Sequence, residues 1–339
     1  MRGLARMPGS YHMSDIDRQR ITFVLPVFNE SRGIEEFYRR LTAAAGELEP
    51  RYHLEFFFVD DGSRDDSLDR LIDLRAVDPR VTVMSFSRNF GHQVAVTAGL
   101  DHADGDAVIV MDTDLQDPPA VSLELVSRWE SGVDVAYAQR RTRKDGAFKR
   151  ASAHAFYWLL SRLASIEIPR DVGDFRLLDR RVVLELRRYP EHHRFLRGLV
   201  SYVGFRQEAV LFDRDARFSG VTGYSLRKMF RLAVDGVVGF STVPLHLISR
   251  LGFAISALSF VGVLYVLAVR FLAPQDAVPG WAFVTVAMFL LGGIQLIMLG
   301  VLGSYVGRTY VEVQHRPLYT VAMMLSDTVS PMTPPDRRE

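Results

Sequence analysis

Short apolar runs alternate with longer, partly polar segments between residues 20 and 138, and each run ends in a polar loop. The runs predict strands at Arg20–Pro26, Leu54–Val59, Val81–Phe86, Val108–Met111 and Val133–Ala138. The segments between them predict helices at about 31–48, 65–76, 91–103 and 119–130. Strands that alternate with helices form a mostly parallel sheet with helices on both faces, and ligands bind beyond the carboxyl ends of its strands. The sequence therefore predicts an α/β fold of the Rossmann-like kind.

The fourth run ends in a cluster of carboxylates, Asp112, Asp114 and Asp117, with Gln116 among them. Such side chains offer hard oxygen ligands to Mg²⁺ or Mn²⁺, and the remaining coordination positions can go to phosphate oxygens. One interpretation is a metal–diphosphate site. The other is a polar turn that ends the strand, with the following Pro-Pro pair starting the next helix.

Composition and missing motifs exclude several functional classes. The 339-residue chain has a formal net charge of +1, which argues against bulk binding to nucleic acid, because a phosphate-tracking surface leaves a basic excess. It has no cysteine, so disulfides, thiolate zinc sites and cysteine nucleophiles are excluded. Neither a G-x-G-x-x-G motif after the first strand nor a P-loop motif is present, so the residues support neither a dinucleotide dehydrogenase nor a P-loop NTPase.

Two long apolar stretches, about 251–272 and 281–306, predict transmembrane helices, because each can cross a hydrocarbon core of about 30 Å. The alternative is a buried helical hairpin. Lys and Arg flank the pair on both sides, and the turn between the stretches has none. Because basic flanks stay in the cytoplasm, both termini and the sheet are predicted to be cytoplasmic, in an integral protein of the cytoplasmic membrane.

Four segments follow from these patterns. Residues 1–20 are polar and predict a disordered leader, 21–230 a cytoplasmic domain with interface helices, 231–307 the membrane region and 308–339 a cytoplasmic C-terminal segment. Within the basic stretch 132–250, residues 154–163 and 227–234 predict short apolar helices. This combination is typical of a surface that contacts an anionic and apolar partner.

Six motifs in order carry a resemblance to a known family. They are LPVFNE (25–30), VDDGSRD (59–65), SRNFGHQVAVTAGLDHADGDAVIVMDTDLQDPP (87–119), GDFRLLDR (173–180), RFLRGL (194–199) and GSYVGRTYVEVQHRPLY (303–319). Together they resemble the polyisoprenyl-phosphate glycosyltransferases, which are family 2 glycosyltransferases of the GT-A fold. The chain is similar to dolichyl-phosphate mannose synthases and closer to bacterial bactoprenol glucosyltransferases.

The resemblance implies roles for individual residues. The implied metal ligands for Mg²⁺ or Mn²⁺ are Asp112, Asp114 and Gln116, and the implied catalytic residues are Asp114 and Asp174. The implied donor-binding residues are Pro26, Phe28, Glu30, Asp60, Asp61, Asn89 and Asp112. The implied ligands of the acceptor phosphate are Arg140, Lys149, Arg194, Arg197 and Lys228.

Some of these roles have structural alternatives. The Asp60-Asp61 pair also fits a helix-capping turn, and the basic run after the fifth strand also fits a solvated loop. Asp174 could orient a sugar hydroxyl, accept a proton or only stabilise a turn. Where the family often has a lysine this chain has Gly223, which leaves that part of the acceptor site open.

The resemblance implies inverting transfer of a sugar, with UDP-glucose as the preferred donor, to undecaprenyl phosphate for modification of cell-envelope glycans. The implied partners are a nucleotide sugar, a polyprenyl phosphate lipid, the bilayer and other copies of the chain, but no nucleic acid. A processive polysaccharide synthase is the alternative enzyme, but its Q-x-x-R-W motif is matched only by Leu125–Trp129, which lacks the Gln. A noncatalytic membrane scaffold or sugar-nucleotide sensor is a third possibility.

Overall fold

The computed structural model describes residues 18–141, 172–192, 194–213 and 280–326, together with separate positions of a helical stretch between 245 and 265. The predicted helices at 154–163 and 227–234, the candidate residues Lys149 and Lys228, and residues 1–17 of the predicted leader lie outside the described residues.

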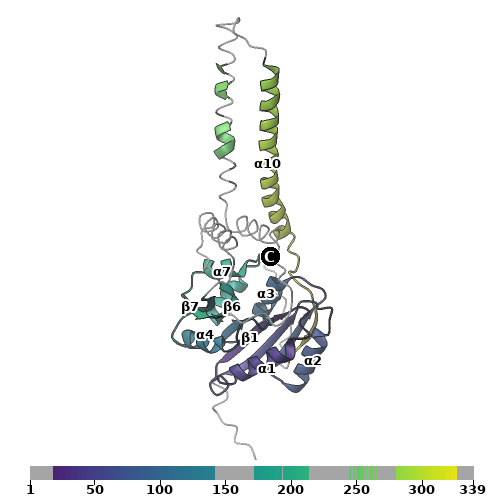
Figure 1. The fold of residues 1–339 in the computed structure, drawn as a ribbon, viewed down its shortest axis with the longest axis vertical. Helices are drawn as coiled ribbons and strands as arrows, with labels where there is room; N and C mark the ends of the chain where they lie inside the picture. The colour runs from purple at the N-terminus through teal and green to yellow at the C-terminus, as the bar shows by residue number, and fades with distance from the viewer. Residues whose placement is uncertain are drawn as a thin grey trace, which may run out of the picture.

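The first part of the chain forms the predicted α/β sheet (Figure 1). Its strands are β1 (Arg20–Val27), β2 (His53–Asp60), β3 (Val81–Phe86), β4 (Ala107–Val110) and β5 (Val135–Arg140). The helices between them are α1 (Ile34–Ala45), α2 (Ser67–Val77), α3 (His92–His102) and α4 (Val121–Glu130). β1 pairs in parallel with β2 and β4, and β2 pairs in parallel with β3. The prediction of strands alternating with helices is confirmed.

Three strands were not predicted: β6 (Val172–Asp179), β7 (Gln207–Phe212) and β8 (Val321–Leu325). The sheet has eight strands in the order β7-β5-β6-β4-β1-β2-β3-β8. β6 lies between β4 and β5 and is antiparallel to both, and β8 is antiparallel to β3. The sheet is therefore mixed, and β8 joins it from the part of the chain predicted as a separate C-terminal segment.

Helices cover both faces of the sheet. On one face α1, α2 and α4 pack over a core that is rich in phenylalanine, including Phe23, Phe37 and Phe56. On the other face lie α3, α6 (Arg180–Arg187) and α7 (Leu196–Tyr202). α3 approaches so closely that a Cβ on Gly99 would lie 2.2 Å from Val24 Cγ1. Glycine at this position lets α3 pack directly against β1.

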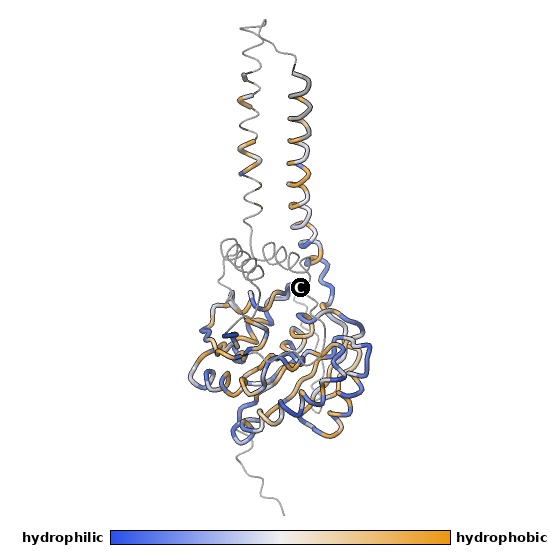
Figure 2. The backbone as a smooth tube through the Cα atoms, in the orientation of Figure 1, coloured by the Kyte–Doolittle hydropathy of each residue, from blue (hydrophilic) through white to orange (hydrophobic). Residues whose placement is uncertain are grey.

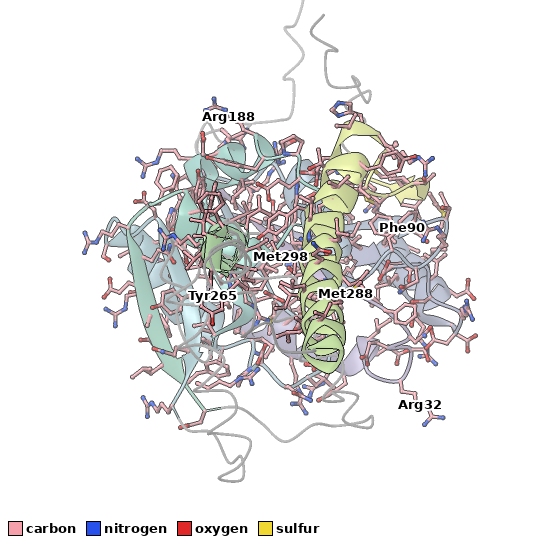
Figure 3. All side chains as sticks on the ribbon, turned by 90° about the horizontal axis from the view of Figure 1, so that it is seen from above. Arg32, Phe90, Arg188, Tyr265, Met288 and Met298 are labelled. Atoms are coloured by element: carbon pink, nitrogen blue, oxygen red, sulfur yellow. The ribbon has the colours of Figure 1, made fainter. Side chains whose placement is uncertain are left out.

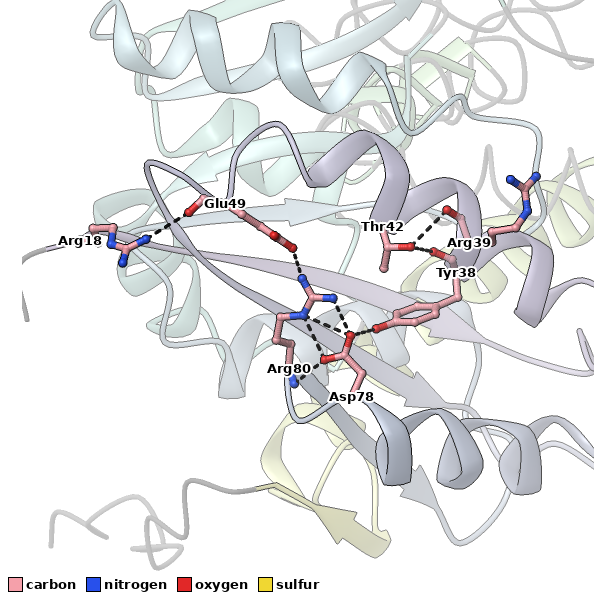
Figure 4. Close-up of polar contacts among 7 residues, drawn as sticks. All are labelled: Arg18, Tyr38, Arg39, Thr42, Glu49, Asp78 and Arg80. Atoms are coloured by element: carbon pink, nitrogen blue, oxygen red, sulfur yellow. Dashed lines mark hydrogen bonds and ion pairs between the residues drawn. The ribbon is translucent and has the colours of Figure 1, made fainter. Parts of the chain in front are cut away.

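A polar network lies at the amino edge of the sheet, opposite the carboxyl ends of its parallel strands (Figure 4). The Asp78 carboxylate accepts hydrogen bonds from Tyr38 Oη at 2.5 Å and from Arg80 Nη2 at 2.6 Å. Arg80 also forms an ion pair with Glu49. Burial and the bond to Asp78 raise the pKa of the Tyr38 hydroxyl. The polar groups of this edge therefore bind one another, and they join α1 to the start of β3.

One helix of the described part of the chain, α10 (Trp281–Val313), contains a segment long and apolar enough to cross a membrane. It rises away from the sheet in Figure 1, and the part of it that is coloured in Figure 2 is largely hydrophobic. Leu290–Val313 contains an 18-residue segment with a mean hydropathy of 1.7, and none of that segment is buried against the rest of the protein. α10 begins where the second apolar stretch begins and continues past its predicted end at Val306.

One described residue of the first apolar stretch lies beside α10. It belongs to a shorter apolar helix over Arg250–Gly262, where a Cβ on Gly252 would lie 3.2 Å from Met298 Cε of α10. Met298 is labelled in Figure 3. Because only part of 251–272 is described, the crossing of two helices stays a prediction.

Candidate active site

The loops at the carboxyl edge of the sheet are joined through Asp61. Its carboxylate accepts hydrogen bonds from the backbone N–H groups of Phe90 at 2.7 Å and Gly91 at 2.9 Å, and from Asn89 Nδ2 at 2.8 Å. Burial raises the pKa of Asp61, although the backbone donors oppose this. Asp61 and Asn89, both predicted to bind the donor, thus hold the loop after β3 in place.

Asp60 is also engaged inside the protein. Its Oδ2 accepts a hydrogen bond from Ser85 Oγ at 2.7 Å, and its Oδ1 accepts one from the Ser63 N–H at 3.1 Å. Gly62 has a φ of +65°, and a Cβ there would lie 2.4 Å from the carbonyl carbon of Arg88. The loops after β2 and β3 therefore touch, backbone to backbone, at a position that only glycine permits. Nothing in these contacts makes Asp60 a helix cap.

The loop after β1 meets the acidic loop after β4. The Pro26 carbonyl accepts a hydrogen bond from Thr113 Oγ1 at 2.9 Å, and the Glu30 N–H donates to Ser67 Oγ at 2.9 Å. Phe28 is 42% exposed between these anchors. A large apolar ring on the ligand-binding edge provides a flat surface on which a nucleotide base can stack.

The acidic loop after β4 contains an enclosed carboxylate oxygen. Asp112 Oδ1 is enclosed and has no hydrogen-bond partner, and its nearest cationic group is His92 Nε2 at 3.4 Å. Burial, aided by the neighbouring charges of Asp174, Asp117 and Asp114 and opposed by His92, raises the pKa of Asp112 to about 6. Asp114 Oδ1 accepts a hydrogen bond from the Gln116 N–H at 3.1 Å.

An enclosed carboxylate oxygen without a donor, next to a second carboxylate, fits Mg²⁺ or Mn²⁺, which prefer hard oxygen ligands. Within the described ranges no three His, Asp or Glu side chains converge as a complete metal cage. Asp112, Asp114 and Gln116 could therefore supply part of a coordination shell, and phosphate oxygens would have to complete it.

Asp174, on β6, is the centre of a second polar cluster. Its Oδ1 accepts a hydrogen bond from Arg197 Nε at 2.9 Å, and its Oδ2 accepts from Arg197 Nη2 at 3.2 Å and Gln93 Nε2 at 3.0 Å. His92 Nε2 lies 3.3 Å from the same Oδ2. Burial acts to raise the pKa of Asp174, but His92 and Arg197 outweigh it, so the pKa lies well below the usual range. Asp174 is an anion at neutral pH.

His92 connects the two clusters. Its Nε2 is 3.3 Å from Asp174, which lies on β6, and 3.4 Å from Asp112, which follows β4. Burial acts to lower the pKa of His92, but the two carboxylates outweigh it and raise the pKa. His92 and Gln93 were not predicted as site residues, although they directly follow the SRNFG segment where α3 begins.

The residues predicted to bind the acceptor phosphate do not all lie together. Arg140, at the end of β5, has its Nη2 3.9 Å from the position of a Cβ on Gly173, so it lies beside the GDF segment. Arg197 binds Asp174, as described above. Arg194 is 3.4 Å from Asp101 of α3 and its side chain is only 10% exposed. The structure therefore brings Arg140 and Arg197 to β6 and pairs Arg194 with a different carboxylate.

The chain is similar in sequence to known glycosyltransferases. Residues 22–187 match the Glycosyl transferase family 2. The chain is 46% identical over 301 residues to the uncharacterized glycosyltransferase YkcC of Bacillus subtilis (strain 168), covering 88% of this chain and 92% of that protein. It is 40% identical over 303 residues to the bactoprenol glucosyl transferase of Shigella phage SfV, covering 89% and 98%.

Among solved structures, the mannosyltransferase PcManGT from Pyrobaculum calidifontis, in complex with GDP-Man and Mn²⁺, is 17% identical over 88% of each chain with a TM-score of 0.44. The sequence relatives, by contrast, match over nearly their whole length. The chain is therefore a glycosyltransferase and belongs to glycosyl transferase family 2.

Proposed function

We propose that the protein transfers glucose, with inversion, from UDP-glucose to undecaprenyl phosphate, giving a polyprenyl-phosphate sugar for cell-envelope glycan modification. The observation that carries this proposal is the 40% identity to bactoprenol glucosyl transferases over 89% of the chain. The two polar clusters at the carboxyl edge are consistent with it. The cluster with Asp112 fits a metal-bound diphosphate, and the other holds the Asp174 carboxylate beside Arg197.

The donor would lie across the loops after β1, β2 and β4. Phe28 would stack on the base, and Pro26, Glu30, Asp60, Asp61 and Asn89 would shape the nucleoside pocket. Asp112, Asp114 and Gln116 would hold Mg²⁺ or Mn²⁺, which stabilises the charge that develops on the leaving diphosphate. Asp112 and Asp114 would also place the anomeric carbon near Asp174, because His92 spans the distance between the two clusters.

The acceptor phosphate would bind near Arg140, whose planar guanidinium matches phosphate oxygens. A phosphate monoester has a second pKa near 6, so at neutral pH it is largely a dianion and already a nucleophile. The lowered pKa of Asp174 makes this carboxylate a weak base. We therefore assign Asp174 to orienting substrate, and the attacking phosphate needs no general base.

The topology of the sheet supports two membrane crossings. β7 and β8 belong to one sheet, and α10 lies between them in the chain. If α10 crosses the bilayer, the chain between β7 and β8 must cross an even number of times. The apolar stretch 251–272 would supply the second crossing, with the sheet and both termini in the cytoplasm, where nucleotide sugars are made. Association into homo-oligomers stays a prediction.

A donor panel tests the proposal. The full chain, purified in detergent, is incubated with undecaprenyl phosphate and radiolabelled nucleotide sugars, with Mg²⁺, with Mn²⁺ or with EDTA, and label in the organic phase is counted. We expect transfer of glucose from UDP-glucose that EDTA abolishes. Transfer of another sugar would correct the donor, a water-soluble polymer would identify a processive synthase, and no transfer from any donor would contradict enzymatic activity of this kind.

A further inference from the structure

The contact between Arg197 and Asp174 links α7 to β6. Two nitrogens of one guanidinium, Nε and Nη2, donate to the two oxygens of one carboxylate, at 2.9 and 3.2 Å. This two-point geometry fixes both the position and the plane of the carboxylate, which a single hydrogen bond does not. Gln93 Nε2, at 3.0 Å from Oδ2, adds a third donor from α3.

Because Asp174 is buried, its carboxylate needs a partner such as Arg197 to be stable as an anion. The Asp174 side chain is 7% exposed, whereas that of Arg197 is 32% exposed. A carboxylate removed from water is stable as an anion only when hydrogen bonds and an opposite charge compensate for lost hydration. Arg176, also buried, turns its Nη2 to the Gly173 carbonyl at 2.8 Å instead of donating to Asp174. Arg197 is therefore the arginine that bonds directly to the Asp174 carboxylate.

An arginine near β6 could either bind the acceptor phosphate or hold the Asp174 carboxylate, and Arg140 and Arg197 differ in this respect. Arg140 reaches the Gly173 backbone from β5, whereas Arg197 directs its two-point contact at a carboxylate. A guanidinium whose Nε and Nη2 face a carboxylate cannot present the same edge to a phosphate.

We infer that Arg197 is a positioning residue that holds Asp174 in place for sugar transfer, and that it does not bind the acceptor phosphate. The kinetic test of this inference rests on the proposed function, because it measures sugar transfer to undecaprenyl phosphate. It replaces, for Arg197, the role in phosphate binding that the family resemblance implied. Asp174 remains the group that meets the substrate, and Arg197 acts through it.

A double-mutant cycle tests the inference with the full chain in detergent, undecaprenyl phosphate, UDP-glucose and Mg²⁺. The variants are Arg197→Ala, Arg197→Lys, Asp174→Asn and the double Arg197→Ala/Asp174→Asn. Arg188→Ala is the matched control, because Arg188 is a neighbouring arginine whose side chain is 75% exposed and pairs only locally with Glu185. We expect Arg188→Ala to match the wild type.

We expect Arg197→Ala to lower kcat by roughly 10- to 100-fold, the usual effect of losing a partner of a site residue. The KM for undecaprenyl phosphate should stay within about twofold of the wild type, because the phosphate keeps its ligands. Arg197→Lys should recover part of kcat. The double variant should be no slower than Asp174→Asn alone, because residues that act as a unit are not additive.

Two kinetic outcomes would overturn the inference. A rise of about tenfold or more in the KM for undecaprenyl phosphate with kcat retained would make Arg197 a phosphate ligand. Losses that multiply in the double variant would show that the two residues act independently.

Thermal unfolding tests the pairing without any activity. Arg197→Ala leaves a buried carboxylate without its two-point arginine partner, so the melting temperature should fall by several degrees, and adding Asp174→Asn should restore part of it. No restoration would count against the pairing. If the wild type transfers no sugar from any donor, the proposed function fails while this measurement still decides the pairing. If Arg197→Ala does not fold, Arg197→Lys with and without Asp174→Asn completes the same cycle.

Discussion

The ring of Tyr319 stacks on the ring of Phe86, with centroids 5.0 Å apart and planes inclined by 21°. Phe86 ends β3, and Tyr319 precedes β8, more than two hundred residues later. The Ser87 N–H donates to the Thr320 carbonyl at 3.0 Å, beside the same stack. The chain that leaves α10 therefore returns to the sheet next to the loop that carries Asn89.

We expect Tyr319→Ala to lower the free energy of unfolding by about 2 kcal/mol, less than a fully buried aromatic, because the ring is partly exposed. Differential scanning fluorimetry of the purified chain measures the loss as a lower melting temperature. Tyr319→Phe is the control and should stay close to the wild type, since Tyr319 Oη lies 3.5 Å from His102 Nδ1, at the limit of a hydrogen bond. Equal stability of the Ala variant would show that β8 docks without the stack.

Asp114→Ala should reduce glucose transfer by about 100-fold or more, because a lost ligand weakens stabilisation of the leaving diphosphate. Organic-phase counting at saturating Mg²⁺ measures the rate, and the melting temperature should not change. Glu124→Ala on α4, whose side chain is 53% exposed, controls for loss of one acidic group. Near-normal metal-dependent transfer by Asp114→Ala would reject its role as a ligand.

Arg140→Ala should raise the KM for undecaprenyl phosphate by roughly 10- to 100-fold, since a hydrogen bond between charged groups contributes about 1.5–3 kcal/mol. The KM for UDP-glucose should change little, because a phosphate-holding arginine acts on one substrate. Initial rates with each substrate varied in turn give both constants, with Arg188→Ala as the control. An effect confined to the donor would place Arg140 in the other half of the site.

Stability should depend on pH through the network in Figure 4. The hydrogen bond from Arg80, opposed by burial and aided by Tyr38, lowers the pKa of Asp78 to about 2. Because the folded pKa lies below the unfolded value of about 3.9, this contribution is present above pH 4 and is lost as the pH falls through about 2. Asp78→Asn should therefore lower the melting temperature at pH 7, and the difference from the wild type should shrink between about pH 4 and 2. A difference that does not vary with pH would contradict this.

Membrane topology can be tested with single cysteines, because the chain has none of its own. If both apolar stretches cross the bilayer, a cysteine introduced by Asp276→Cys should react with an impermeant maleimide added to intact cells, and one introduced by Ser326→Cys should react only after lysis. Labelling of both positions only after lysis would favour a hairpin that does not cross. Labelling of Ser326→Cys alone in intact cells would invert the topology and separate the sheet from cytoplasmic sugar nucleotides.

Local patterns were sufficient to predict much of the fold. The strand Val81–Phe86 has the predicted bounds, and β1 starts at the predicted residue, because an apolar run between polar loops depends only on neighbouring residues. The acidic cluster after β4 could be recognised for the same reason. Its placement at the carboxyl edge followed from the parallel pairing that strands alternating with helices require.

The strands β6 and β8 could not be predicted in this way. β6 contains Asp174 and Arg176, charged residues that interrupt an apolar run, and both are buried. Asp174 can be buried because Arg197 and Gln93 come to it from other elements, whereas Arg176 donates to the Gly173 carbonyl of its own strand. β8 is a strand of the sheet only because the chain returns to β3 after α10.

The sequence by itself determined the order of the elements, the acidic loop with Asp112 and Asp114, and the apolar stretch that becomes α10, since each depends on residues close together in the chain. Only the tertiary structure decided that Arg197 faces Asp174, and that His92 lies between Asp174 and Asp112. These contacts join residues 23, 82 and 20 positions apart. A carboxylate buried in a sheet takes its partners from whichever elements the fold brings beside it, and that choice is made by packing and the requirement to compensate a buried charge.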